Sequence, residues 1–277
     1  MLNFKPAAIV GFLGGVALFV GAIFLTSETP LIYLNLHGAM IVVGGTVAAS
    51  LIAFPSVQLK NAFARAWQLI KKDHPVSKGD LERFIRVAGL RQQNAMAKIE
   101  EEIERANSPF VRTGLQLVID GLPSDDIASV LELRMKNQEL IERNEALVFK
   151  TMATFTPAFG LAATLIGLVN MLFMMGQGAT AQHVGTNMSL ALIATFYGVV
   201  LANGFLRPLA TKIELKTQDR LRAMAIIVEA IRCISEGRGP SHVREVLFAI
   251  VADHGDEMGL RDTLVAMTEA DLYQSKA

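Results

Sequence analysis

The stretch "TFTPAFGLAATLIGLVNMLFMM", Thr154–Met175, decides the fold, because it is uncharged and long enough to cross a lipid bilayer as a helix. Small and hydroxyl-bearing residues nevertheless recur along it at spacings of three and four, at Pro157, Gly160, Thr164 and Gly167. This spacing places them on one face of a helix. Lipid alone requires no such face, so the pattern predicts that another protein segment lies against it.

The composition extends this interpretation to the whole chain. The 277 residues are 52% hydrophobic, and the mean hydropathy of +0.39 is too high for an ordinary soluble domain. Charged residues are missing from three long segments, 6–27, 29–59 and 151–206. A spanning helix needs about 20 apolar residues, so we predict an all-α polytopic membrane protein with four transmembrane helices, at about 6–26, 36–54, 152–175 and 187–206.

Lysine and arginine predict the orientation in the membrane. Lys5 precedes the first span, segment 55–150 holds fifteen of these residues, and segment 207–277 holds ten. The two short connectors, 27–35 and 176–186, hold none. By the positive-inside rule, both termini and the large loop are cytoplasmic.

The segments outside the membrane are predicted to be helical. No Pro or Gly lies between Asp126 and Thr156, so a helix capped by Ser124 is expected to run directly into the third span. The fourth span is expected to continue past Pro208 until Gly237–Pro240 breaks it. The predicted organisation is transmembrane helices 1 and 2 in 1–54, a cytoplasmic helical loop in 55–150, transmembrane helices 3 and 4 in 151–208, and a cytoplasmic helical tail in 209–277.

Several functional classes are not expected. The sequence has no Gly-rich phosphate loop, nucleophile elbow or His–Cys metal spacing, so we do not predict an enzyme or a resident cofactor. A formal net charge of zero does not indicate a nucleic-acid surface. The single cysteine, Cys233, allows no disulfide within the chain and is expected to be a buried apolar residue.

The small and hydroxyl residues of the last two spans admit more than one interpretation. Met171 and Met174 continue the face in the third span, and the fourth span carries a similar face with Ala191, Thr195, Gly198 and Ala202. The glycines and alanines fit close packing within one helix bundle. The threonine hydroxyls fit either a hydrogen bond to their own helix or presentation of oxygen to an ion. Pro157 also fits a first-turn proline.

Acidic residues are absent from all four predicted spans. Glu28 lies at the outer edge, and Glu145 and Glu214 fall in the cytoplasmic segments. Proton and cation carriers usually place a carboxylate within the membrane. If cations cross here, another chain must supply the acid.

The sequence resembles a known family. "TPAFGLAATLIGLVNML" and "MSLALIATFYGVVLANGFLRPLATKIE" resemble the third and fourth membrane helices of flagellar stator A subunits, the MotA/PomA type of the MotA/TolQ/ExbB superfamily. "IVVGGT", Ile41–Thr46, is similar to their second helix, and "FVRTGLQLVIDGLPSDDIASVLE" to their cytoplasmic loop. The resemblance extends from the N terminus to about residue 250.

The resemblance implies an assembly and a partner that supplies the missing acid. Five A subunits are expected to surround a dimer of MotB/PomB-like B subunits, each with one membrane aspartate and a peptidoglycan-binding domain. Movement of Na⁺ or H⁺ through that aspartate would turn this homopentamer in the bacterial inner membrane and drive the rotor protein FliG.

The resemblance also assigns residues. Pro157 and Pro208 match the membrane prolines of the family, and Thr164 and Thr195 match the threonines of the sodium-driven PomA type. With Gly160, Gly167, Met171, Gly198 and Ala202 they are expected to form the ion path and the B-subunit interface. Because sodium prefers oxygen ligands, Thr164 and Thr195 are candidate sodium ligands, and sodium is favoured over protons.

The expected rotor contact departs from the family pattern. Arg91 and Glu100 are the candidates, but nine positions separate them where the family has about eight, and a solvated helix face remains an alternative. Two other functions therefore stay open. One is an ion-driven energiser of a non-flagellar envelope complex, and the other is a membrane scaffold that conducts nothing.

Overall fold

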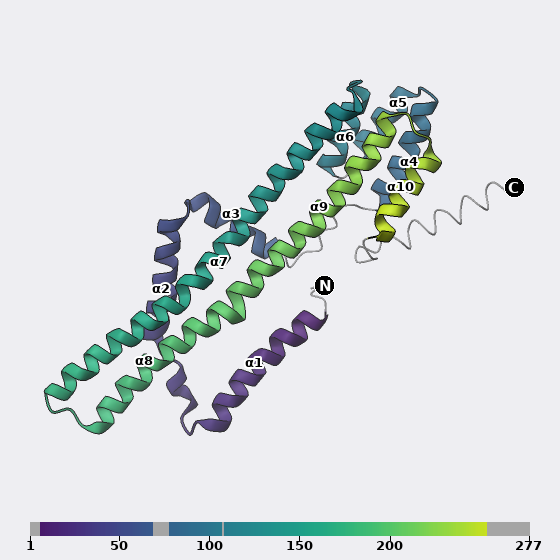
Figure 1. Ribbon diagram of the computed structural model, residues 1–277. Coiled ribbons are helices and arrows are strands. Elements are labelled where there is room, and N and C mark those ends of the chain that lie inside the picture. The colour runs from purple at the N-terminus through teal and green to yellow at the C-terminus, as the bar shows by residue number, and fades with distance from the viewer. Residues whose placement is uncertain (1–5, 69–77, 107, 254–277) are drawn as a thin grey trace. The chain divides into compact units, whose positions relative to one another are not determined.

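The computed structural model describes residues 6–68, 78–106 and 108–253, and the regular structure within these ranges is entirely helical (Figure 1). The prediction of an all-α fold is therefore confirmed. The helices of the first half of the chain are α1 (Pro6–Thr26), η1 (Pro30–Tyr33), α2 (Leu36–Ala53), α3 (Ser56–Gln68), α4 (Lys78–Gln92), α5 (Met96–Glu104) and α6 (Pro109–Ile119). They are followed by α7 (Ser124–Gly176), α8 (Ala181–Leu201), η2 (Ala202–Leu206), α9 (Arg207–Ser235) and α10 (Pro240–Asp253).

Helix α7 is the longest element, with 53 residues. It runs without a break from the charged sequence that follows Ser124 into the apolar stretch, as predicted. Ser124 is its first residue rather than its cap. Asp125 and Asp126 lie in the first turn, where acidic side chains interact favourably with the helix dipole. Pro157 lies deep inside α7, so the interpretation of a first-turn proline is wrong.

The fourth predicted span also continues beyond the membrane sequence. Helix α8 passes through η2, a single π-helical turn, into α9. The N–H of Arg207 donates to the carbonyl of Ala202, five residues earlier. Pro208 follows directly, and because a proline ring crowds the preceding turn, the wider π turn accommodates it without ending the helix. The predicted break follows Ser235, at Gly237, whose φ of +72° favours glycine.

Three helical segments among the described residues are long and apolar enough to cross a membrane. They are Pro30–Ala53, Ser124–Gly176 and Ala181–Ser235. Helix α1 covers the predicted first span as a single helix of 21 residues.

The chain divides into two compact units. Unit 1 comprises residues 1–72 and 141–215, and unit 2 comprises residues 73–140 and 216–277. Because the boundaries fall inside α7 and α9, each of these helices contributes to both units.

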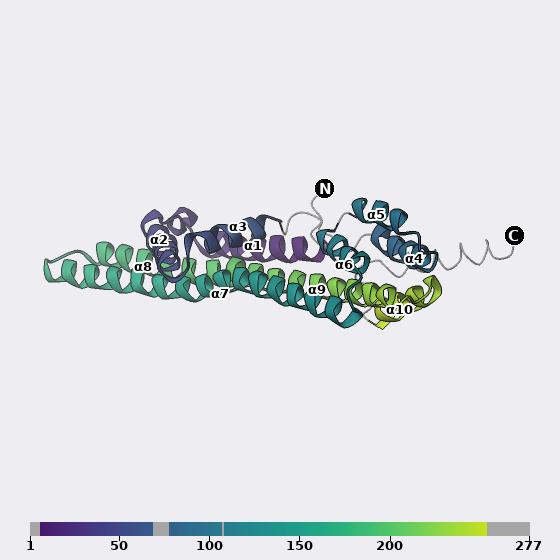
Figure 2. The same ribbon diagram turned by 90° about the horizontal axis from the view of Figure 1, so that it is seen from above.

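In unit 1, α7 and α8 lie side by side in both views (Figures 1 and 2), and α2 packs against them. Glycines allow this packing. A Cβ atom at Gly45 would lie 2.3 Å from the ring of Phe159, and one at Gly38 would lie 3.0 Å from the Cβ of Ala194. Helix α3 is joined to α7 by Arg65, whose guanidinium pairs with the buried carboxylate of Glu142.

Unit 2 has a separate apolar core formed by α4, α5, α6, α9, α10 and the first part of α7. Its largest fully buried side chains include Phe84, Leu115 and Ile231. Gly114 of α6 allows a close approach to α9, because a Cβ atom there would lie 2.1 Å from the Cδ1 of Ile231. Cys233 is buried in this core, as predicted.

Candidate functional site

The glycines of the predicted face bring the backbones of α7 and α8 together. A Cβ atom at Gly198 would lie 2.9 Å from the carbonyl oxygen of Thr156 and 3.1 Å from the Cα of Pro157. A Cβ atom at Gly160 would lie 3.1 Å from the Cα of Thr195. Backbone atoms cannot yield as a flexible side chain can, so a Cβ atom at Gly198 would force the helices apart, and one at Gly160 would require the backbone of α8 to shift by a few tenths of an ångström. The packing interpretation therefore holds for them.

The other predicted members of this face are placed differently. Gly167 faces α8, where a Cβ atom would lie 2.5 Å from the Cβ of Ala191. Ala202 is fully buried in the apolar cluster of unit 1 that also contains Phe149 and Ile213. Met171 is half-buried, and Pro208 is exposed at the start of α9. The predicted face thus lies partly against the same chain, and its contact with a B subunit stays a prediction.

The two candidate sodium ligands lie together at this crossing. The Oγ1 atoms of Thr164 and Thr195 are 2.5 Å apart. Thr164 Oγ1 is 3.2 Å from the carbonyl oxygen of Gly160 and 3.0 Å from that of Ala191. Thr195 Oγ1 is 3.1 Å from the carbonyl oxygen of Gly160. We call these two hydroxyls and two carbonyls the oxygen cluster.

The oxygen cluster has more oxygen–oxygen contacts than hydrogens to fill them. Four contacts join its atoms, but each threonine hydroxyl carries one hydrogen. The two hydroxyl hydrogens are therefore shared among the four contacts. Both hydroxyls are half-buried between the helices and carry no net charge.

A second group of hydroxyls, not predicted from the sequence, lies between α2 and α7. Thr46 Oγ1 is 2.6 Å from the carbonyl oxygen of Val42 and 3.3 Å from Thr156 Oγ1. Ser50 donates to the carbonyl of Thr46 at 2.7 Å. These side chains are almost completely buried. The sequence feature that could have predicted this group is the i, i+4 spacing of Thr46 and Ser50, which places two hydroxyls on one face of an otherwise apolar span.

The two candidate rotor residues have different environments. The guanidinium of Arg91 is half-buried and donates to the carbonyls of Val118 at 3.3 Å and Ser235 at 3.4 Å, near the C-terminal ends of α6 and α9. Glu100 is exposed on α5. Within the described ranges, no hydrogen bond or ion pair joins the two side chains. Arg91 thus links the ends of α6 and α9 within unit 2, and a rotor contact by either residue stays a prediction.

Comparisons with known proteins agree with the sequence pattern and the helical architecture. The model of the MotA/TolQ/ExbB proton channel family matches residues 102–226. The chain is 32% identical to Motility protein A of Aquifex aeolicus over 220 residues, which cover 77% of this chain and 84% of that protein.

Two solved structures share the fold. The structure of C. jejuni MotAB aligns with a TM-score of 0.81 at 20% identity, covering 92% of this chain and 98% of that chain. The structure of the flagellar MotAB stator complex from Bacillus subtilis aligns with a TM-score of 0.78 at 24% identity, covering 87% and 94% respectively.

The matched family is one of channels rather than enzymes, as the sequence indicated. The relatives and the fold together place the chain in one branch of it. This protein belongs to the MotA/TolQ/ExbB proton channel family, and within that family to the MotA-type stator A subunits.

Proposed function

We propose that this chain is the torque-generating A subunit of a bacterial flagellar stator in the inner membrane, and that sodium is its coupling ion. The flagellar assignment rests on its similarity to Motility protein A of Aquifex aeolicus and to the stator complex of Bacillus subtilis. The assignment of the ion rests on the oxygen cluster formed by Thr164, Thr195, Gly160 and Ala191.

The oxygen cluster supports sodium for a chemical reason. A sodium ion that leaves water needs several oxygen ligands at once, whereas a proton needs only one acceptor. The cluster offers two hydroxyls and two carbonyls in one place. Threonine hydroxyls have no useful acidity near neutral pH, so they cannot carry protons as carboxylates do.

A B-type stator subunit is the expected source of the counter-charge. Residues 151–206 contain no Asp or Glu, and a bare cation within a membrane protein requires an anionic partner. A single-span partner with a membrane aspartate would complete the site. We expect five copies of this chain around two such partners, with the exposed charges of unit 2 acting on the rotor protein FliG.

Motility of a strain that lacks this chain tests the proposal. We expect the deletion strain to stop swimming in sodium medium, and a plasmid copy to restore swimming in sodium but not in potassium medium at the same ionic strength. Swimming in potassium medium at the wild-type speed would contradict sodium coupling. A deletion strain that swims normally would contradict the flagellar role and favour another envelope complex.

A further inference from the structure

We propose that Asn170 of α7 and Asn187 of α8 form an outer cation-binding step, at which an entering sodium ion exchanges part of its hydration water for amide oxygens before it reaches the oxygen cluster. This inference rests on the proposed stator function and extends its ion route toward the connector between α7 and α8, which the charge pattern predicts to lie outside. Neither asparagine belongs to the residues expected to line that route.

The register of α7 against α8 places the two asparagines at a similar depth. Gly167 lies opposite Ala191, because a Cβ atom at Gly167 would be 2.5 Å from the Cβ of Ala191. The two helices form an antiparallel hairpin (Figure 1). Asn170 follows Gly167 by three positions and Asn187 precedes Ala191 by four, so the two side chains share one level. At about 1.5 Å per residue, this level lies about 9 Å beyond Thr164 along α7.

Helix α2 begins below this level of the hairpin. Its cap residue, Asn35, accepts a hydrogen bond from the N–H of Gly38 at 3.2 Å and donates to the carbonyl of Leu190 at 3.1 Å. The start of α2 is thus fixed near Leu190, and the α7–α8 hairpin extends past it in both views (Figures 1 and 2). Asn170 and Asn187 therefore lie in the part of the hairpin beyond the start of α2.

The half-buried amide of Asn187 presents its oxygen rather than its nitrogen. The nitrogen carries two hydrogens, and it lies 2.9 Å from the carbonyl oxygen of His183 and 3.3 Å from the sulfur of Met174. Both hydrogens therefore have acceptors within the hairpin. Among the described residues, no donor bonds to the Oδ1 atom of Asn187, so this oxygen is available to a ligand that needs an acceptor.

Asn170 is exposed within the apolar stretch of α7 that is long enough to cross a membrane. Its side chain makes no hydrogen bond within residues 6–68, 78–106 and 108–253. Lipid tails offer an amide no hydrogen bond, and leaving the amide unpaired there costs about 1–3 kcal/mol. The position is therefore expected to face water or a polar ligand rather than lipid.

Asn170 also borders the side of α7 that packs on α8. It shares a helix face with Gly167 and Met174, three and four positions away, and both of these residues contact α8. Val169 is 68% exposed and lies two positions from Gly167, so it points away from α8. The amide of Asn170 thus lies beside the same helix crossing as the oxygen cluster.

A cation suits these amides better than a neighbouring helix does. Asn187 has only an acceptor left to offer, and the backbone N–H groups of a membrane helix are already used within that helix. Side-chain carbonyls of asparagine are among the oxygen ligands that hard cations accept in proteins. Neutral ligands hold a cation weakly, as a step that the ion must leave again requires.

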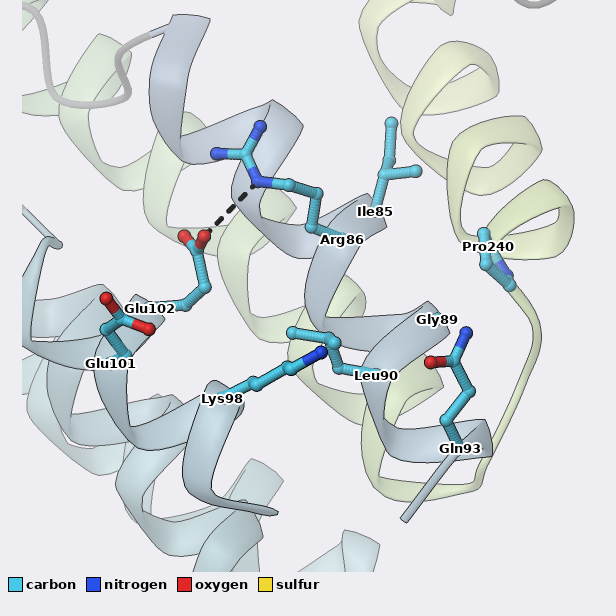
Figure 3. A pocket seen from close by; sticks show the side chains of 9 residues that line it. All are labelled: Ile85, Arg86, Gly89, Leu90, Gln93, Lys98, Glu101, Glu102 and Pro240. Atoms are coloured by element: carbon cyan, nitrogen blue, oxygen red, sulfur yellow. Dashed lines mark ion pairs between the residues drawn. The ribbon is translucent and has the colours of Figure 1, made fainter. Parts of the chain in front are cut away.

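The open groove between α4 and α5 in unit 2 offers no comparable cation site, although two carboxylates line it (Figure 3). Glu102 pairs with Arg86 at 3.5 Å, and Glu101 pairs with Arg105 at 2.6 Å. A cation that entered the groove would compete with these guanidinium groups. The oxygen of Asn187 meets no such competitor in the part of the chain that the structure describes.

The sodium dependence of swimming speed tests the outer step in a strain in which this chain is the only A subunit. Asn170→Leu and Asn187→Leu each remove one amide at similar side-chain volume, whereas Asn170→Asp keeps the shape and an oxygen. Thr186→Val is the matched control. It removes a hydroxyl at nearly the same depth, but the hydrogen of that hydroxyl is donated within α8, to the carbonyl of Gln182 at 3.0 Å.

We expect each leucine variant to raise the sodium concentration for half-maximal speed about three- to tenfold, as the loss of one oxygen contact predicts, and to reach the parent's speed in saturating sodium. Thr186→Val should match the parent, and Asn170→Asp should need no more sodium than the parent. A contact with a partner helix would instead lower the maximal speed and the amount of B-type partner that co-purifies. That result, with the half-maximal sodium concentration unchanged, contradicts the outer step.

A thiol probe gives an independent measurement that needs no working motor. Cys233 is the single cysteine of the chain and is buried, so an introduced cysteine is the reactive one. We expect a membrane-impermeant thiol reagent to label Asn170→Cys and not Val169→Cys in membranes that contain the whole complex, because the reactive thiolate forms only where water has access. Equal labelling at the two positions, or none at position 170, overturns the proposal.

Failure of the stator function itself has a different sign. A parent strain whose speed does not depend on sodium contradicts sodium coupling and the outer step together. A parent strain that depends on sodium, with leucine variants that follow the parent's sodium curve, contradicts the outer step alone.

Discussion

The Oγ1 atoms of Thr164 and Thr195 lie 2.5 Å apart, one on α7 and one on α8, although 31 positions separate them in the sequence. Two glycines make this contact possible. Gly160 and Gly198 bring the helix backbones so close that the side chains one turn further along meet. Packing and chemistry at this crossing are therefore not alternatives, because the close packing of the glycines creates the oxygen cluster.

Removal of one hydroxyl tests the chemical role of the oxygen cluster. Thr164→Val keeps the shape of the side chain but deletes an oxygen, whereas Thr164→Ser keeps the oxygen. We expect Thr164→Val to raise the sodium concentration needed for half-maximal swimming speed at least about tenfold, since losing one charge-assisted contact costs roughly 1.5–3 kcal/mol. Thr164→Ser should remain within about threefold of the parent. Identical sodium curves for the two variants would argue against coordination by this hydroxyl.

The packing role is tested at Gly198. Gly198→Ala places a methyl group 2.9 Å from a backbone oxygen of α7, so we expect the helices to separate and the free energy of unfolding to fall by about 1–3 kcal/mol. Gly185→Ala in α8 is the control, because a Cβ atom there meets nothing within 4 Å. Thermal unfolding of the purified proteins in detergent measures both. Equal melting temperatures for the two variants would count against the close crossing.

Arg91 is expected to matter for stability. Arg91→Ala removes two hydrogen bonds from a cation to backbone carbonyls, and we expect a loss of about 2 kcal/mol. Glu100→Ala, at an exposed position, should change stability by less than about 0.5 kcal/mol. Thermal unfolding again distinguishes them. A fully stable Arg91→Ala protein that no longer turns the rotor would restore Arg91 as a contact residue.

Cys233 predicts a dependence of stability on pH. Burial, followed by the nearby carboxylates of Glu229 and Glu236, raises the pKa of its thiol above the ordinary value of 9.0. The thiol of the unfolded chain loses its proton at a lower pH than the buried thiol of the folded chain. The contribution of Cys233 to the free energy of unfolding is therefore fully present below pH 9 and decreases as pH rises further. We expect the stability difference between the parent and Cys233→Ala to narrow between pH 8 and pH 10. Parallel profiles would contradict the raised pKa.

Much of the fold follows from the sequence because it depends on local chemistry. The uninterrupted helix from Ser124 into the third span follows from the absence of Pro and Gly before Thr156, and the break after Ser235 follows from Gly237. The π turn at 202–206 did not follow, because a proline in a helix can be accommodated by a kink, a break or a wider turn, and the surrounding packing selects among them. Pro157 shows the same limit, since its place inside α7 depends on the residues that precede it.

The candidate site was predictable in its residue types but not in its partners. Spacing placed Thr164 and Thr195 each on the small-residue face of its own helix, but the direct contact between them depends on the register of α7 against α8. The role of Arg91 was hidden for a similar reason. Its two acceptors, Val118 and Ser235, are 27 and 144 positions away in the sequence, and local spacing carries no information about such distant carbonyls.

Ion flux into vesicles tests most directly whether the uncharged spans of this chain require a carboxylate from another chain. The protein is purified, reconstituted alone or with a B-type partner that has a membrane aspartate, and assayed for sodium uptake under an inward gradient. We predict no selective sodium uptake by this chain alone, uptake with the partner, and loss of that uptake when the partner's aspartate is changed to asparagine. Selective sodium or proton uptake by this chain alone would contradict the claim that its uncharged spans require a carboxylate from another chain.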